Sequence, residues 1–238
     1  MHEYKQFYRR KLPHLHSPGG TLFVTFRLAN SIPKSVINRY KNEKQFIEHQ
    51  IRTSLIVSSE TNEVTDSRSS KLKEFHRNWF RKFEEVLHNE TTGPAWLVER
   101  EVAAMIYESL IHRHGKEYDL KAFSIMSNHV HAVFKPYLSE RSLIETREGH
   151  RTRFESSEPT LAVIMRSLKG YTARTANKIL NRSGSFWEAE SYDHEVRNNE
   201  EFFRIVKYVL QNPVKAGLVD SWQRWEWNWV ADDLRHYF

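Results

Sequence analysis

The sequence contains no cysteine and little glycine or proline, with 8 and 7 residues among 238. Without cysteine there is no disulfide framework and no thiolate-bound zinc or iron–sulfur centre, which suits the cytoplasm. Few glycines and prolines argue against a turn-rich all-β sandwich and favour long helices with a few strands. No apolar run approaches the roughly 18 residues that a membrane span requires, and mean hydropathy is -0.69. We therefore expect a cytoplasmic protein with no secretory signal and no membrane partner.

The balance of charge favours a polyanionic partner. Basic residues outnumber acidic ones by 36 to 30, for a net charge of +6 and a pI near 9.4. Residues 1–41 contain eight basic side chains and one acid, and residues 161–187 contain five basic side chains and no acid. Ordinary surface charge would explain any one of these residues equally well. Two acid-poor segments in one chain are better explained by contact with a polyanion.

The order of predicted elements indicates an α+β fold. These elements are strand 21–28, helices 35–51, 71–88 and 96–114, strands 118–126 and 129–135, helix 161–180, strand 186–196 and helix 199–211. This order predicts a ferredoxin-like βαββαβ arrangement with a four-stranded antiparallel sheet, helices packed on one face, and extra C-terminal helices and a tail. We expect one domain over 1–238, with polar insertions near 58–70 and 137–159 and a Trp-rich tail over 220–238.

Three His-x-His pairs occur where composition alone predicts about 0.7. They are His14 and His16, His112 and His114, and His129 and His131. The first pair falls in a predicted loop, and the second falls on a helix, where residues two apart point about 200° away from each other. On a strand, residues two apart share a face with their Cα atoms about 6.6 Å apart, so both imidazoles can reach one metal ion. The third pair is therefore the candidate metal site, with two ordinary strand histidines as the alternative.

Tyr171 is the candidate nucleophile. It lies at the edge of the apolar stripe of the 161–180 helix, and Arg174 and Lys178 follow it along the same flank. A phenol beside cations and without a nearby carboxylate would suit attack on a phosphate. The alternative is an amphipathic packing residue whose hydroxyl faces water.

Several motifs together resemble one known family. They are the run 118–131, which ends in His129-Val130-His131, the segments Leu168–Arg174, Gly184–Glu188 and Tyr192–His194, the run Asn212–Val219, and the N-terminal segments 9–14 and 24–28. In their order and spacing they resemble the REP-associated tyrosine transposases, which are single-tyrosine HUH transposases. Relatives usually carry Met-Pro-Asn before the histidine pair, and Ser127 replaces that proline here.

The resemblance implies a nucleoid-associated, metal-dependent endonuclease and strand transferase that acts on hairpin-forming repeats in single-stranded DNA. His129 and His131 would hold Mg²⁺ or Mn²⁺ at the scissile phosphate, and Tyr171 would attack it. The products would be a 5′-phosphotyrosine and a free 3′-OH. The sequence has no Walker-type glycine loop, which fits strand rejoining without a nucleotide triphosphate. We also expect a monomer, with a homodimer as the alternative.

The third metal ligand is less clearly marked. Relatives commonly supply an amide side chain one turn after the tyrosine, and Thr175 occupies that place after Tyr171. A hydroxyl is a poorer ligand than an amide oxygen, so we expect altered metal affinity. Asp193, Glu190, His194 or water are the alternative ligands.

DNA contacts are expected from the basic segments. The predicted residues are Arg9, Arg10, Lys11, Lys169, Arg174, Lys178 and Arg182, which would neutralise phosphates and make binding salt-dependent. The tail places four tryptophans in residues 222–229, which would either stack on unpaired bases or clamp the C-terminus onto the body.

Two alternative functions are also compatible with the sequence. A non-catalytic, domesticated hairpin-DNA-binding protein would use the same fold only to hold DNA. A metal-dependent hydrolase would use water in place of the tyrosine, although no carboxylate cluster accompanies the histidines.

Overall fold

The computed structural model describes residues 6–9, 13–17, 19–39, 42–43, 45–46, 49, 82, 85–87, 93–137 and 160–238. The chain packs as two compact units, formed by residues 1–29 with 95–238 and by residues 30–94, where the sequence predicted one domain. In the second unit, residues 34–39 are helical, and Ile32 and Leu87 are buried. The predicted polar insertion at 58–70 lies outside the described residues. Residues 138–159 of the second predicted insertion, near 137–159, also lie outside them.

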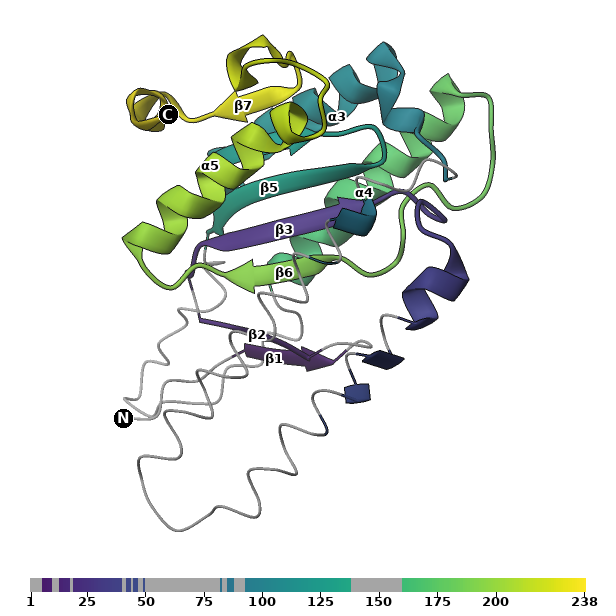
Figure 1. Cartoon of the computed structure of the whole chain (residues 1–238), viewed down its shortest axis with the longest axis horizontal. Coiled ribbons are helices and arrows are strands. Elements are labelled where there is room, and N and C mark those ends of the chain that lie inside the picture. The colour runs from purple at the N-terminus through teal and green to yellow at the C-terminus, as the bar shows by residue number, and fades with distance from the viewer. Residues whose placement is uncertain are drawn as a thin grey trace, which may run out of the picture. The chain divides into compact units, whose positions relative to one another are not determined.

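The first unit contains a five-stranded antiparallel sheet with the order β6-β3-β5-β4-β7 (Figure 1). Its strands are β3 (Leu22–Arg27), β4 (Tyr118–Ile125), β5 (His129–Pro136), β6 (Tyr192–Glu195) and β7 (Asn228–Val230). The order β6-β3-β5-β4 is that of a ferredoxin-like sheet, so the predicted fold class is confirmed. The strand count differs, because β7 adds a fifth strand beside β4. A separate two-stranded sheet pairs β1 (Gln6–Arg9) with β2 (Pro13–His16).

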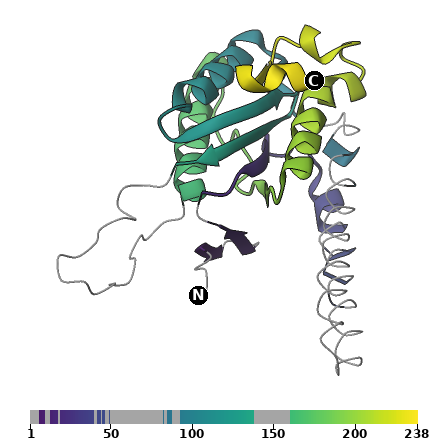
Figure 2. The same ribbon diagram turned by 90° about the vertical axis from the view of Figure 1, so that its left-hand side faces the viewer.

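Helices cover both faces of the five-stranded sheet. α3 (Arg100–Arg113) and α4 (Thr160–Ile179) lie on one face, as predicted, and α5 (Asn199–Lys215) lies on the other (Figure 2). Short 3₁₀ helices span Trp96–Val98, Trp222–Arg224 and Asp232–Tyr237. The two helices of the βαββαβ core thus share a layer, and the added C-terminal helix forms the second layer.

The alternation of side chains along β3 and β5 decides which residues meet which helix. Val24 and Ala132 are paired across the two strands and belong to the core beneath α3 and α4. Their neighbours Thr25 and His131 are also paired, and must therefore point to the opposite face. The pair His129 and His131 accordingly faces the layer that contains α5.

α5 begins and ends at definite signals. The Asn198 side chain accepts a hydrogen bond of 2.8 Å from the backbone N–H of Glu201, which caps the first turn. The sequence predicted an end at Asn212 and Pro213, but the helix continues to Lys215. A proline so close to the end removes only one backbone hydrogen bond, and Ala216 N still donates to Asn212 O at 3.0 Å. The extra turn keeps Lys215 on the same helix as Tyr208 and Asn212.

The Trp-rich tail packs onto the body. Trp227 and Trp229 lie against the core, and the ring of Trp229 stacks on Phe123 at 6.0 Å. The indole N–H of Trp225 donates to the carbonyl of Ile125 at 3.0 Å. These contacts favour the clamp interpretation of the tail over base stacking.

Candidate active site

Two buried histidines on β5 point their Nε2 atoms at each other. His129 and His131 are 1% and 0% exposed, and their Nε2 atoms are 3.0 Å apart. Two ligands bound about 2.1 Å from one ion at right angles to each other would be about 3.0 Å apart. The spacing of the two imidazoles therefore fits adjacent positions around a divalent metal ion. The two rings also share one face of β5, as the alternation of side chains along a strand predicted.

The outer nitrogens of both rings are held by hydrogen bonds. His129 Nδ1 lies 2.6 Å from Asn128 Oδ1, an atom that only accepts, so this nitrogen carries the ring proton and Nε2 presents a lone pair. His131 Nδ1 lies 2.8 Å from the hydroxyl of Thr25, which can either donate or accept. His131 can therefore donate from Nε2 to His129 while no ion is bound, and present a lone pair when one is. Such outer-shell partners are typical of metal-binding histidines.

Tyr208 of α5 lies on the same face of the sheet. Its ring centroid is 5.7 Å from that of His131, and 6.1 Å from the ring of Phe23. Asn212 follows four residues later, one helical turn along, and is fully buried. At 100° per residue, Asn212 is about 40° around the helix from Tyr208, towards the buried side. One turn of α5 thus brings a phenol and an amide to the layer of the histidine pair.

Tyr171 lies in the other layer, which corrects the sequence prediction. It projects from α4, its side chain is 47% exposed, and its ring centroid is 6.0 Å from the Arg113 guanidinium of α3. α4 packs on the face of Val24 and Ala132, so the sheet separates this tyrosine from the histidines. Thr175 is on the same helix and is separated from the histidines in the same way. The prediction that these two residues complete the histidine site is therefore wrong.

The alternative third ligands are also placed by the structure. Glu190 and Asp193 line a cavity on the α4 side of the sheet. His194 pairs with Phe23 across β6 and β3, so it is on the α5 face, where its Nε2 lies 3.2 Å from Glu201 Oε1. Burial lowers the pKa of His194, although Glu201 opposes the shift. Within the described ranges no three His, Asp or Glu side chains converge on a metal-sized site. Asn212 is a fully buried amide on α5, the helix that covers the face of the histidine pair.

A buried cation flanks the histidines. Arg27 is paired with His129 across β3 and β5, so both side chains leave the same face of the sheet. Its guanidinium donates to Glu188 Oε2 at 3.3 Å, and burial lowers the pKa of Arg27 while Glu188 opposes that shift. This ion pair ties the segment before β6 to the edge of the site.

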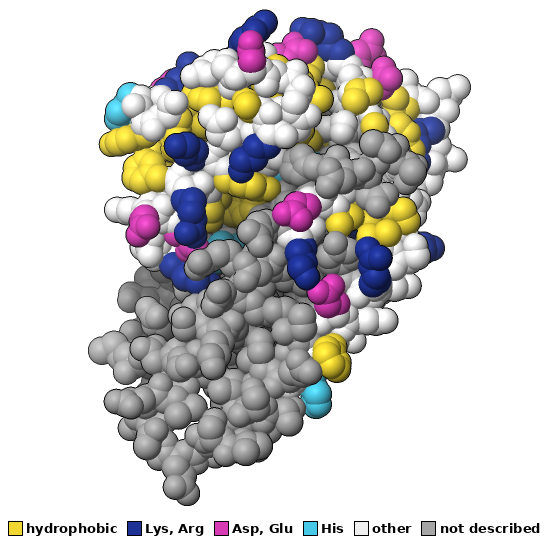
Figure 3. Space-filling model, in the orientation of Figure 1, with side chains coloured by type: hydrophobic (Ala, Val, Ile, Leu, Met, Phe, Trp, Pro, Cys, Tyr) yellow, Lys and Arg dark blue, Asp and Glu magenta, His cyan; other side chains and the backbone are white. Residues whose placement is uncertain are grey.

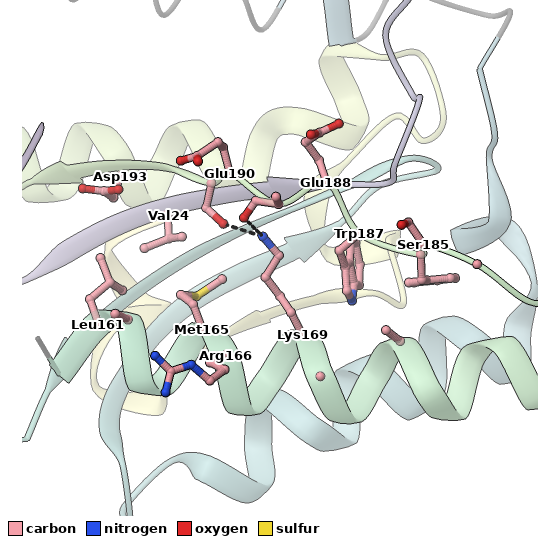
Figure 4. Close-up of a pocket in the computed structure, with 17 residues that line it drawn as sticks. Val24, Leu161, Met165, Arg166, Lys169, Ser185, Trp187, Glu188, Glu190 and Asp193 are labelled. Atoms are coloured by element: carbon pink, nitrogen blue, oxygen red, sulfur yellow. Dashed lines mark hydrogen bonds between the residues drawn. The ribbon is translucent and has the colours of Figure 1, made fainter. Parts of the chain in front are cut away.

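Two of the predicted DNA-binding cations are engaged within the protein. Lys169 reaches across a cavity of about 360 Å³ between α4 and residues 184–193, and donates to Ala189 O at 3.1 Å and Ser191 Oγ at 3.0 Å (Figure 4). Arg182 bonds to the Asn177 side chain and lies 3.6 Å above the ring of Trp96. Arg174 and Lys178 are exposed on α4, in the layer opposite the histidines. Arg10 and Lys11 lie outside the described residues, and Arg9 belongs to β1.

The α5 face presents cations that the sequence prediction missed. Figure 3 views the molecule from this side, where several dark blue Lys and Arg side chains lie beside yellow apolar surface, with magenta acidic side chains among them. Arg204, Lys207 and Lys215 of α5 are all exposed. The ammonium nitrogen of Lys215 lies 4.6 Å from the centre of the Tyr208 ring. The half-buried tyrosine therefore lies at the border between the histidine site and a basic surface.

The sequence contained a signal for Tyr208 and Asn212. A tyrosine followed one turn later by an amide is the arrangement that the resemblance in sequence implies, and only a threonine follows Tyr171 at that distance. Asn212 was already part of the run that supported the resemblance. Asn212 was not singled out as a candidate because Asn212 and Pro213 were interpreted only as the end of a helix.

Comparison with known proteins finds a similarity to a solved structure. No protein-family model matches the sequence, and no curated protein matches it. Among solved structures, the chain is similar to a REP-associated tyrosine transposase bound to a REP hairpin, with a TM-score of 0.45 and 13% identity, over 100% of this chain and 84% of that one. Among the described residues, no helix is long and apolar enough to cross a bilayer.

Proposed function

We propose that this protein is a metal-dependent single-stranded DNA endonuclease and strand transferase whose nucleophile is Tyr208. The observation that carries the proposal is the convergence of the two histidine Nε2 atoms, 3.0 Å apart, with Tyr208 in ring contact with His131. The sequence motifs that resemble the HUH transposases support the same chemistry, and extend it to hairpin-forming repeats as the substrate. Tyr208 replaces Tyr171 in this role because Tyr171 lies in the other layer.

Each residue has a defined part in the reaction. His129, His131 and the Asn212 amide oxygen would hold Mg²⁺ or Mn²⁺, and two imidazole ligands favour Mn²⁺ because Mg²⁺ takes mainly oxygen ligands. When bound, the ion would withdraw charge from the oxygens of the scissile phosphate. The Tyr208 hydroxyl gives up its proton as its oxygen forms a bond to phosphorus, the bond to the 3′-oxygen breaks, and that oxygen takes up a proton, so that no net proton is gained or lost. A 5′-phosphotyrosine and a 3′-OH result, and attack by another 3′-OH reverses the step on a new strand.

A covalent adduct tests the proposal. Purified protein is incubated with labelled single-stranded DNA from its host's repetitive hairpins, with Mn²⁺ or Mg²⁺, and analysed on a denaturing gel. Wild type and Tyr171→Phe should give a protein-linked band, and Tyr208→Phe and His129→Ala should not. Tyr171→Phe is the matched control, because it removes the same hydroxyl from the opposite layer.

Other outcomes would select the rival functions. Cleavage that persists in Tyr208→Phe would contradict a tyrosine nucleophile and favour a water-using hydrolase. Loss of the adduct in Tyr171→Phe alone would return the role to that residue. Tight hairpin binding with no adduct from wild type would favour a non-catalytic binding protein.

A further inference from the structure

Two cations on α5 are aligned with Tyr208 on the solvent side of the helix. Arg204 precedes the tyrosine by four residues and Lys215 follows it by seven. At 100° per residue, both lie within about 40° of Tyr208 around the helix, at about 6 Å and about 10.5 Å along its axis. Tyr208 therefore has a positive charge on each side along one stripe of the helix.

Both cations are exposed at the surface of the protein. The Lys215 ammonium is already beside the Tyr208 ring, at 4.6 Å from its centre. The side chain of Arg204 is 55% exposed and donates to Glu201 Oε1 at 3.3 Å. Glu201 also bonds to His194 and accepts from the Arg197 N–H at 2.9 Å through Oε2, so it keeps these partners if Arg204 turns to a phosphate. The Arg204 end of this ion pair is exposed, whereas the Glu201 side chain is 11% exposed.

We propose that Arg204 and Lys215 bind the phosphates on either side of the one presented to Tyr208, so that the DNA strand runs along α5. This inference rests on the proposed function, and it locates the strand. A backbone of regularly spaced negative charges fits a line of cations with the nucleophile between them. The predicted cations of α4 do not fit this path, because α4 packs on the other face of the sheet.

Salt-dependent binding of single-stranded DNA tests the path. A fluorescently labelled single-stranded oligonucleotide containing the host's repetitive hairpin is titrated with wild type and with an Arg204→Gln, Lys215→Gln double variant at several salt concentrations. Each lost phosphate contact lowers the slope of log K against log salt by about 0.7, so the double variant should lose about 1.4. At about 0.1 M salt, a decrease of about 1.4 in the slope corresponds to a loss of affinity of up to about 25-fold.

A matched control separates the path from a general effect of charge. Arg235 is paired with Asp232 three residues away at 3.2 Å, as Arg204 is with Glu201, and Lys116 is an exposed lysine beside the His112 ring. A Lys116→Gln, Arg235→Gln double variant removes the same charge and should keep the wild-type slope. An equal loss of slope in this control, an unchanged slope in the α5 variant, or no DNA binding by wild type would overturn the proposal.

The two proposals fail in different ways. If wild type binds DNA through the α5 cations but forms no covalent adduct, the catalytic proposal fails and the path stands. If the adduct forms and the α5 variant binds DNA with the wild-type slope, the path fails and the chemistry stands. Thermal unfolding, monitored by circular dichroism, checks that both double variants are folded.

Discussion

Replacing Thr25 by valine should weaken metal binding without removing any metal ligand. Thr25 is 3% exposed, and its hydroxyl lies 2.8 Å from His131 Nδ1. When His131 Nε2 binds an ion, Nδ1 carries the proton and needs an acceptor, which the hydroxyl supplies. Valine has nearly the shape of threonine, so the change removes this acceptor and little else.

The magnitude follows from the cost of a buried donor without a partner. That cost is about 1–3 kcal/mol, which corresponds to about 5- to 150-fold in an equilibrium constant. Loss of an outer-shell partner of a metal-bound histidine typically reduces affinity by about 10- to 100-fold. Because the metal-free protein also loses a hydrogen bond from Thr25 to His131, we expect about tenfold for Thr25→Val.

Calorimetric titration of Mn²⁺ into the metal-free protein measures this effect directly. Thr25→Ser keeps the hydroxyl and should bind Mn²⁺ with nearly the wild-type affinity. Unfolding by heat shows whether each variant is folded before the titration. Binding of Mn²⁺ by Thr25→Val within about twofold of wild type would refute the tautomer argument, since that argument requires the hydroxyl.

Two further predictions concern stability. Thr172→Val should lower the free energy of unfolding by about 1–3 kcal/mol in denaturant titrations, because the buried Thr172 hydroxyl accepts a hydrogen bond from Trp187 Nε1 at 2.8 Å. Thr172→Ser keeps the hydroxyl and should retain most of the wild-type stability. An unchanged denaturation midpoint for the valine variant would contradict the prediction. His194 has a lowered pKa because it is buried, so the unfolded chain binds its proton more readily, and stability should fall as the pH drops below the ordinary histidine value of about 6.5. His194→Gln should flatten this part of a pH series of unfolding measurements, and an equally steep loss in the variant would assign the dependence to other groups.

The fold was accessible from sequence because its main elements have strong periodicity. The hairpin around Ser127 and Asn128, the helix 161–180 and the start of α5 all lie close to their predicted bounds. β7 was missed because three residues are too few to show alternation, and because the surrounding tryptophans suggested a tail. Its pairing with β4 depends on a tertiary contact that no local sequence pattern predicts.

The shared face of the two histidines was predicted and the position of Tyr208 beside them was not, for a physical reason. Alternation along one strand shows that His129 and His131 share a face, whereas the face on which a helix packs depends on how the chain crosses the sheet. The sequence nevertheless indicated which face of the sheet the histidines occupy. Val130, between the two histidines, belongs to the core on which the apolar stripe of the helix that carries Tyr171 packs, so the histidines had to face away from that helix.

The most direct test of the central claim is the position of the DNA on the protein after the cleavage reaction. Trypsin cuts after Lys207 and Lys215, which yields the peptide 208–215, and after Lys169 and Arg174, which yields 170–174. After nuclease digestion of the adduct, mass spectrometry should find the nucleotide mass on the peptide that contains Tyr208. A nucleotide on the peptide that contains Tyr171 would contradict the account, as would an adduct on any residue other than Tyr208.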